Sequence, residues 1–371
     1  MKSEVHRIVE TPEGELPRKP AVLLAMPHLS FGGAERWAAA IARQLAAEGH
    51  TVVLAVLGHK AGEADAGSDW FAPHVKELAR WGGGKEAPGV FLGRLAEKWS
   101  ADVLVLVGRS CAYAALPGLR ALRGGLHVVS FQFNVVELSE EHTRFCSYID
   151  AVIVEGSDVA DSLAQRGFPW GKIFEIPSAI DVPAHLPAPF SGQKRGGLVG
   201  FIGRMDASSK DPWVFLEMAE RLGDRPLRFL MIGDGPEAEP VRRRLRERRL
   251  PVEYLRHVRD RELAAHLASL DILVVPSRND GRPLIIQEAQ AWGKPVVASR
   301  VGSIPELLMD GEAGILCEPG DAAGFAAAVR RLWDDSPLRS RLAEAGQRRV
   351  GREGDLRLHL PLLKNIFFSA G

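Results

Sequence analysis

The sequence predicts an α/β protein made of two Rossmann-like domains, and three features lead to this prediction. Short apolar runs rich in β-branched residues alternate with segments of helical periodicity, as in parallel sheets covered by helices. A strand–loop–helix–strand order occurs near the start and again after residue 197. The chain has 371 residues, more than one ordinary core accommodates. We therefore expect two facing domains with a ligand cleft between them.

Composition narrows the class of protein. Hydrophobic residues make up 46% of the chain and charged residues 25%, which is typical of a globular protein. Lys and Arg number 47, as do Asp and Glu, so net charge does not favour a nucleic-acid partner. Cys111, Cys146 and Cys317 match no metal-binding spacing and are interpreted as reduced thiols. With no apolar signal core or membrane-length run, we expect a cytoplasmic protein.

The first unit contains a glycine pair at a strand end. An apolar strand over 21–26 precedes Gly32 and Gly33, and a strand over 51–57 follows the helix. The helix has a periodic apolar stripe at Ala34, Trp37, Ala38, Ile41 and Leu45. Glycines let a ligand approach the backbone closely; a tight packing turn is the alternative. The pattern lacks a third glycine, so it does not predict NAD binding.

Further strands complete two domains. They are expected over 103–107, 126–132, 151–154, 172–176, 198–202, 227–232, 272–275, 295–299 and 314–317. The Gly- and Ala-rich residues 58–88 are expected to form loop and short helix. A Pro-rich linker over 182–197 separates domains at 20–185 and 186–355. Residues 356–371 are expected to form a final amphipathic helix.

The first loop of the second domain carries two cations. Gly203, Arg204 and Lys210 follow the strand over 198–202. The next helix is expected to begin at Pro212, with Asp211 as its N-cap. Cations beside a helix N-terminus suit a diphosphate, because the helix dipole also favours negative charge there. A solvent-exposed basic loop is the alternative.

A second candidate loop follows the strand over 272–275. Asp280 and Glu288 flank a tight turn, and the helix after it is expected to stop at Gly293. The N–H groups of the turn lie at a helix N-terminus, which attracts anions. Glu288 could accept hydrogen bonds from two adjacent hydroxyls. A sugar nucleotide offers such hydroxyls together with a diphosphate.

The segment from Asp280 to Glu288 resembles the signature of the retaining GT-B glycosyltransferases of family 4 (glycosyl transferases group 1). That signature has two Glu separated by seven residues, the first followed by Gly; here Asp280 stands in place of the first Glu. Gly32-Gly33-Ala34-Glu35 resembles an opening common in the family, and residues 176–181 resemble its turn at the end of the first domain. The resemblance runs from about residue 20 to the end.

The resemblance implies an activity. A UDP- or GDP-sugar would donate its sugar to a hydroxyl of a carbohydrate, lipid-linked or small-molecule acceptor, with retention of anomeric configuration. The pathway would be bacterial polysaccharide, glycolipid or glycoconjugate synthesis. The sequence contains no Asp-x-Asp triplet, so no metal or other cofactor is expected. The final helix is expected to pack back on the first domain.

The resemblance also assigns roles to residues of both domains. It makes Arg204, Lys210, Asp280 and Glu288 the catalytic residues, with the two cations at the donor phosphates, Asp280 at the transferred sugar and Glu288 at the ribose. The other donor-binding residues that it implies are Gly32, Gly33, Gly203, Val258, Gly281, Arg282, Pro283 and Leu284. The six arginines within 241–249 are expected on a solvated helix face. Peripheral contact of that face with anionic lipid at the inner membrane surface is the alternative.

One departure from the family concerns its cleft histidine. The family places a His at the end of a first-domain strand, where this chain has Phe131-Gln132-Phe133-Asn134. Gln132 or Asn134 could hydrogen-bond the sugar instead, but neither takes up a proton. Two rival functions follow: a catalytically silent nucleotide-sugar-binding protein, and a GT-B sugar-nucleotide epimerase. The epimerase would need acid and base side chains around the sugar. The sequence leaves the base, sugar, acceptor, linkage and oligomeric state open.

Overall fold

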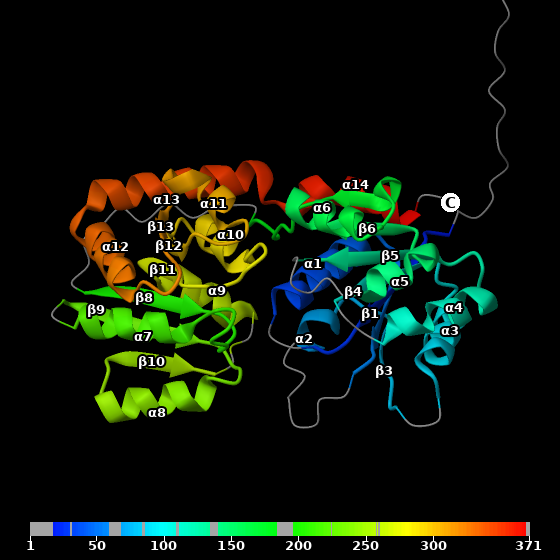
Figure 1. Cartoon of the computed structure of the whole chain (residues 1–371), viewed down its shortest axis with the longest axis horizontal. Coiled ribbons are helices and arrows are strands. Elements are labelled where there is room, and N and C mark those ends of the chain that lie inside the picture. Colours follow the sequence, from blue (N-terminus) through cyan, green and yellow to red (C-terminus); the bar gives the residue numbers. More distant parts are fainter. Residues whose placement is uncertain are drawn as a thin grey trace, which may run out of the picture.

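Two parallel sheets form two α/β domains in the computed structural model (Figure 1). The structure describes residues 18–29, 32–58, 68–83, 86–108, 111–133, 140–183, 196–223, 225–256, 258 and 260–368. The first sheet has seven strands in the order β3-β2-β1-β4-β5-β6-β7, and the second has six in the order β10-β9-β8-β11-β12-β13. The predicted α/β class is confirmed.

The first domain alternates strands and helices. Its strands are β1 (Ala21–Met26), β2 (Thr51–Val56), β3 (Glu77–Arg80), β4 (Val103–Val107), β5 (His127–Gln132), β6 (Ala151–Val154) and β7 (Ile173–Glu175). Its helices are α1 (Gly33–Ala47), α2 (Ser68–Phe71), α3 (Pro88–Lys98), α4 (Ala112–Leu122), α5 (Glu140–Arg144) and α6 (Ser157–Gln165), with short 3₁₀ turns η1 (Cys146–Tyr148) and η2 (Trp170–Lys172).

The second domain repeats this arrangement. Its strands are β8 (Gly197–Ile202), β9 (Leu227–Ile232), β10 (Val252–Leu255), β11 (Ile272–Val275), β12 (Val296–Ser299) and β13 (Ile315–Cys317). Its helices are α7 (Pro212–Arg221), α8 (Ala238–Arg248), α9 (Asp260–Ser269), α10 (Leu284–Ala291), α11 (Ile304–Leu307), α12 (Ala322–Asp334) and α13 (Ser336–Glu353), with the 3₁₀ turn η3 (Met309–Gly311). The chain continues into α14 (Leu356–Phe368).

Buried side chains cover both faces of each sheet. Because strand side chains alternate between faces, β1 sends Val22 and Leu24 into one cluster with α1, and Leu23 and Ala25 into another with α3 and α4. The second sheet is sandwiched in the same way. This two-sided burial explains why its central strands are nearly continuous apolar runs.

Two edge strands were not predicted. Strand β3 lies within residues 58–88, which were expected to form only loop and short helix, and β10 ends the second sheet. Both have partly exposed side chains, so neither shows the fully apolar run of a central strand. Residues 59–67 of the same stretch lie outside the described residues.

The C-terminal helices connect the domains. Helix α13 contributes Leu338 and Leu342 to a second-domain cluster, whereas Val350 near its end belongs to a first-domain cluster. Helix α14 then packs on the first domain through a set of buried residues: Leu356, Leu360, Leu363, Ile366 and Phe367. Figure 1 shows α14 lying over the first domain after α13 has crossed from the second. Within the described part of the chain, no helix has the length and apolarity needed to span a membrane.

Strand order fixes where ligands can approach. In each sheet the winding direction reverses, between β1 and β4 in the first and between β8 and β11 in the second. At such a switch point the loops that leave two neighbouring strands diverge and leave a crevice at their carboxyl ends. The loop with Lys210 follows β8, and the loop with Asp280 follows β11. The two predicted site loops of the second domain therefore share one crevice.

Candidate functional site

The loop after β8 is braced by the loop after β9. The Met205 N–H donates to the Asp234 carbonyl at 2.8 Å, and the Glu237 N–H donates to the Met205 carbonyl at 2.9 Å. Gly233 has φ +148°, and a Cβ there would lie 1.8 Å from the Gly203 carbonyl oxygen. Only glycine fits this approach. The backbone from Gly203 onward is thus fixed before any ligand binds.

The loop before α10 is held on two sides. The Arg278 and Asn279 N–H groups donate to the Ser209 carbonyl at 2.8 and 3.2 Å. On the other side, the Ser303 N–H and hydroxyl both donate to the Gly281 carbonyl, at 3.0 and 2.5 Å. Gly302 has φ +50°, and a Cβ there would lie 1.8 Å from the Asp280 carbonyl oxygen. The loop after β12 therefore supports the turn that carries Asp280.

Lys210 and Asp280 meet in the crevice. The Lys210 ammonium forms an ion pair with the Asp280 carboxylate, which also accepts a hydrogen bond from the Ser277 hydroxyl at 3.0 Å. The Asp280 side chain is only 9% exposed and that of Lys210 is 25% exposed. An ammonium has three donors and Asp280 uses one. Lys210 therefore retains donors for an anion that enters the crevice.

Asp211 differs from its predicted role as an N-cap. Helix α7 begins at Pro212 as expected, but Asp211 adopts φ 44° and ψ 67° and its side chain makes no capping bond. Its buried carboxylate instead lies 2.6 Å from the Arg278 guanidinium. The ion pair thus ties the loop after β8 to the loop after β11.

Arg204 lies in the same loop as Lys210 but does not join Asp280. Its side chain is 54% exposed, with Nε 3.8 Å from the Asp206 carboxylate. The Ser208 hydroxyl donates to Asp206 at 2.6 Å, and this hydrogen bond lowers the pKa of the Asp206 carboxyl despite some desolvation. The structure therefore leaves the Arg204 side chain largely exposed and beside Asp206, apart from the Lys210–Asp280 pair.

Glu288 makes its contact across the domain boundary. It lies in α10, and its carboxylate meets the guanidinium of Arg36 from α1 through two contacts of 2.8 and 2.6 Å. The sequence did not point to Arg36, because no local spacing links residues so far apart in the chain. The neighbouring Gln287 amide donates to the Ser178 carbonyl of the first domain at 2.9 Å. Helix α10 thus carries its candidate ribose-binding group at the domain interface.

Three neighbours of Asp280 are more buried than a ligand-facing role requires. The Arg282 guanidinium is buried and donates a hydrogen bond to Glu306 at 3.0 Å. Only the backbone of Arg282 could therefore contact a bound sugar nucleotide. Pro283 is buried and occupies the N-cap position of α10 without a capping side-chain bond. Leu284 packs into a first-domain cluster.

Val258 is buried in the second domain, and residues 257 and 259 beside it lie outside the described residues.

Gly32 and Gly33 differ in their surroundings. A Cβ on Gly32 would lie 2.1 Å from the Glu35 carboxylate, which folds back over it. Gly33, the first residue of α1, is exposed and has no described atom within 4 Å of a built Cβ. Gly32 is therefore explained by packing within its own turn. Packing against the described residues does not explain Gly33, which leaves room for a ligand at the start of α1.

The end of β5 has an aromatic cluster where the resemblance places a histidine. Phe131 packs edge-on against Trp37 with ring centroids 4.4 Å apart, and Phe133 packs on the same ring at 5.8 Å. Gln132 is buried. Asn134 lies outside the described residues. Burial of Gln132 means that a sugar could reach its amide only if the neighbouring residues moved.

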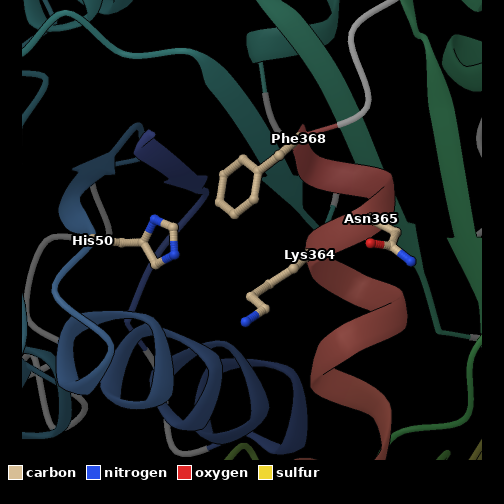
Figure 2. Close-up of a pocket in the computed structure, with 4 residues that line it drawn as sticks. All are labelled: His50, Lys364, Asn365 and Phe368. Carbon is tan, nitrogen blue, oxygen red and sulfur yellow. The ribbon is translucent and has the colours of Figure 1, made fainter. Parts of the chain in front are cut away.

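Two cavities lie away from this crevice. One, of about 380 Å³, is lined by His50, Lys364, Asn365 and Phe368 where α14 meets the first domain (Figure 2). Two of its polar groups already have partners, since Lys364 contacts Glu48 at 2.7 Å and His50 Nδ1 lies 2.9 Å from the Pro20 carbonyl. The second, of about 660 Å³, lies between η3 and α13. Neither is lined by the candidate residues. Among the described residues, no group of three or more His, Cys, Asp or Glu side chains is arranged to hold a metal ion.

Comparison with known families identifies the class of protein. Residues 196–335 match the family Glycosyl transferases group 1, and residues 31–183 match Glycosyltransferase Family 4. The chain belongs to the family 4 (group 1) glycosyltransferases. The first match contains Lys210, Asp280 and Glu288, and the second begins beside Gly32.

Individual family members match part of the chain. It is 35% identical over 158 residues to D-inositol 3-phosphate glycosyltransferase of Corynebacterium diphtheriae, covering 40% of this chain and 37% of that protein. It is 31% identical over 140 residues to glycogen synthase of Mycobacterium tuberculosis, covering 37% of this chain and 34% of that protein. The chain thus aligns with little more than a third of the length of these relatives.

Solved structures match the whole fold. Anabaena Alr3699/HepE in complex with UDP and glucose has a TM-score of 0.76 at 16% identity, covering 93% of this chain and 98% of that one. Sucrose-phosphate synthase from Thermosynechococcus elongatus has a TM-score of 0.75 at 18% identity, covering 95% and 100%. The predicted GT-B architecture is confirmed.

Proposed function

We propose that this chain transfers a sugar from a nucleoside-diphosphate sugar to an acceptor hydroxyl, with retention of anomeric configuration. The observation that supports this best is the Lys210–Asp280 ion pair at the switch point of the second sheet. The same loop leads into α10, which carries Glu288. A cation, two carboxylates and a helix N-terminus thus surround the place where a sugar nucleotide would lie.

The proposed reaction exchanges one bond at the anomeric carbon for another. The bond from this carbon to the diphosphate oxygen breaks, and a bond to the acceptor oxygen forms on the same face of the sugar. The acceptor proton passes to an oxygen of the leaving diphosphate. Negative charge grows on that diphosphate, where Lys210, Arg204 and loop N–H groups would stabilise it. The proposal assigns this role to no metal or other cofactor, so chelation by EDTA should leave the rate unchanged.

Each residue has a defined part in the proposal. Glu288 accepts hydrogen bonds from the ribose hydroxyls. Asp280 and the backbone of residues 281–284 hold the transferred sugar, while Gly33 lets the donor approach α1. Because Asp280 is one methylene shorter than the Glu of the family signature and already pairs with Lys210, it would reach the sugar from farther away. We expect this to affect which donor sugar is preferred.

The names of the relatives and structural neighbours suggest which donor and acceptors to test first. Solved neighbours contain UDP or UDP-glucose, and relatives glycosylate inositol phosphate or are glycogen synthases by name. These names support UDP-glucose as the first donor to test, with polysaccharide, glycolipid and small polyol acceptors. We propose a cytoplasmic enzyme of bacterial glycoconjugate or polysaccharide synthesis.

Two assays test the proposal. A thermal-shift screen of UDP-, GDP- and ADP-sugars should show one donor that raises the Tm, because a ligand bound only to the folded state stabilises it. Release of nucleoside diphosphate should then depend on an added acceptor. A silent binder would give the Tm shift without release, and an epimerase would interconvert donors without acceptor. No Tm shift and no release with any donor would overturn the proposal.

A further inference from the structure

The Glu288 carboxylate, the candidate ribose-binding group, forms a bidentate ion pair with Arg36 of the opposite domain. Arg36 Nη1 donates to Glu288 Oε2 at 2.8 Å, and Arg36 Nη2 lies 2.6 Å from Glu288 Oε1. Two parallel contacts of this kind match the planar fork of a guanidinium to a carboxylate. Figure 1 shows their helices, α1 and α10, at the facing sides of the two domains.

This pair differs from an ordinary surface ion pair. The Arg36 side chain is 24% exposed and that of Glu288 is 11% exposed, so solvent screens the attraction less than at the surface. The Arg36 guanidinium also lies over the ring of Trp70, 5.8 Å from its centroid. The contacts with Glu288 and Trp70 restrict the guanidinium to one position. The orientation of the Glu288 carboxylate therefore depends on α1.

The contact with Arg36 leaves some hydrogen-bond acceptor positions of the Glu288 carboxylate unused. Each carboxylate oxygen has two lone pairs, and a bidentate arginine engages one on each oxygen. The others remain for a pair of adjacent hydroxyls. We propose that Arg36 is a positioning residue, which orients Glu288 for the ribose of the donor. This inference rests on the proposed function and adds a first-domain residue to the second-domain donor site.

The domains have other contacts that would persist without Arg36. The Gln287 amide donates to the Ser178 carbonyl, the Ile180 N–H donates to the Gly354 carbonyl at 2.9 Å, and the Leu356 N–H donates to the Ile180 carbonyl at 2.8 Å. Helix α14 also packs on the first domain. Removal of the Arg36 side chain is therefore expected to change the site without separating the domains.

The test compares nucleotide binding by variants of the two paired residues and of a control residue in α1. UDP, GDP and ADP are each titrated by calorimetry into the wild type, Arg36→Gln, Arg36→Lys, Glu288→Gln and the double variant Arg36→Gln/Glu288→Gln. Arg43→Gln is the matched control, because Arg43 also lies in α1 and forms an ion pair, but with Asp181 of the first domain. Thermal unfolding of each variant confirms that it is folded.

Arg36→Gln should weaken binding of whichever nucleotide the wild type selects by about tenfold or more, the scale of losing charge-assisted contacts. Arg36→Lys, which keeps the charge but not the fork, should lose less, and Arg43→Gln should bind within about twofold of the wild type. If Arg36 acts through Glu288, the double variant should bind no more weakly than Glu288→Gln alone.

Two results would overturn this inference while the proposed function stands. One is a wild type and an Arg36→Gln variant of equal affinity. The other is a double variant whose loss equals the sum of the two single losses in free energy, because independent sites behave in that way. A wild type that binds none of the three nucleotides would instead contradict the proposed function, and the inference with it.

Discussion

Two ion pairs of the candidate site differ in what they join. Lys210–Asp280 links two loops of the second domain, both of which are fixed by backbone hydrogen bonds to their neighbours. Arg36–Glu288 links one domain to the other. The first pair needs only the second sheet to be in place. The second exists only while α1 and α10 are close. The phosphate side of the proposed site thus belongs to the second domain alone, whereas the ribose side depends on a contact between the two domains.

The largest expected effect comes from the pair within the second domain. Lys210→Met keeps most of the side-chain volume but removes the ammonium that would face the diphosphate. We expect kcat to fall by about 10²–10³-fold, as for loss of one preorganised group that stabilises developing charge. The rate of acceptor-dependent release of nucleoside diphosphate measures this fall in kcat.

Lys364→Met is the control for this prediction. Lys364 also contacts a carboxylate, that of Glu48 at 2.7 Å, but lies where α14 packs on the first domain. The Lys364→Met variant should retain the wild-type kcat. Equal rates in Lys210→Met and the wild type would contradict the proposed role of Lys210.

The pair between domains should affect binding more than turnover. Glu288→Gln keeps a side chain that can meet Arg36 but loses the negative charge that would accept the ribose hydroxyls. We expect the KM for donor to rise by about 10–100-fold, the scale of about 1.5–3 kcal/mol for a hydrogen bond to a charged group. Initial rates at varied donor and fixed acceptor separate KM from kcat. A loss confined to kcat would place Glu288 at the reacting centre instead.

The support of the Asp280 turn gives a third prediction. Gly302→Ala introduces a Cβ that would lie 1.8 Å from the Asp280 carbonyl oxygen, so the loop before α10 must move. We expect a loss of stability of about 1–3 kcal/mol and a lower kcat. Thermal unfolding and the transfer assay measure the two effects.

A glycine outside the site provides the comparison for Gly302. Gly167 has φ +92°, also in the left-handed region, but no described atom lies within 4 Å of a built Cβ. Gly167→Ala should therefore lower stability through backbone strain while leaving kcat unchanged. If Gly302→Ala resembles Gly167→Ala in both assays, the turn does not depend on the loop after β12.

The smallest effect concerns the pH dependence of the loop after β8. The hydrogen bond from Ser208 lowers the pKa of Asp206 from its ordinary value of 3.8. A carboxyl with a depressed folded-state pKa contributes stability above its unfolded pKa, and this contribution is lost as the pH falls through the folded value. Ser208→Ala should therefore lower the Tm slightly at pH 7, and the gap from the wild type should narrow as the pH falls below about 4. A gap that stays constant with pH would contradict this assignment.

Sequence patterns predict the parts of this protein that depend on local chemistry. The buried central strands and the stop of α10 at Gly293, where φ is +61°, follow from apolar runs and glycine placement. Proximity of Lys210 and Asp280 depends on the strand order, which the structure shows by pairing β8 with β11. The role of Asp211 does not, because its carboxylate prefers an arginine from another loop to the adjacent helix N-terminus.

Contacts between the domains are the hardest part of the structure to predict from the sequence. Arg36 and Glu288 are 252 positions apart, and nothing in the spacing of either helix links them. Gly302 and Ser303 were likewise missed as supports of the Asp280 turn. Their signal was a Gly-Ser pair in the loop that follows the apolar strand β12, at the same edge of the sheet as the other site loops. Reading all loops at that edge together would have found them.

Nucleotide affinity of the second-domain loops tests the central claim most directly. UDP, GDP and ADP are titrated by calorimetry into the wild type and Lys210→Met at the same ionic strength. We expect one nucleotide to bind the wild type with one-to-one stoichiometry and to bind Lys210→Met at least about tenfold more weakly. Equal affinity for the two proteins would show that the diphosphate is held elsewhere.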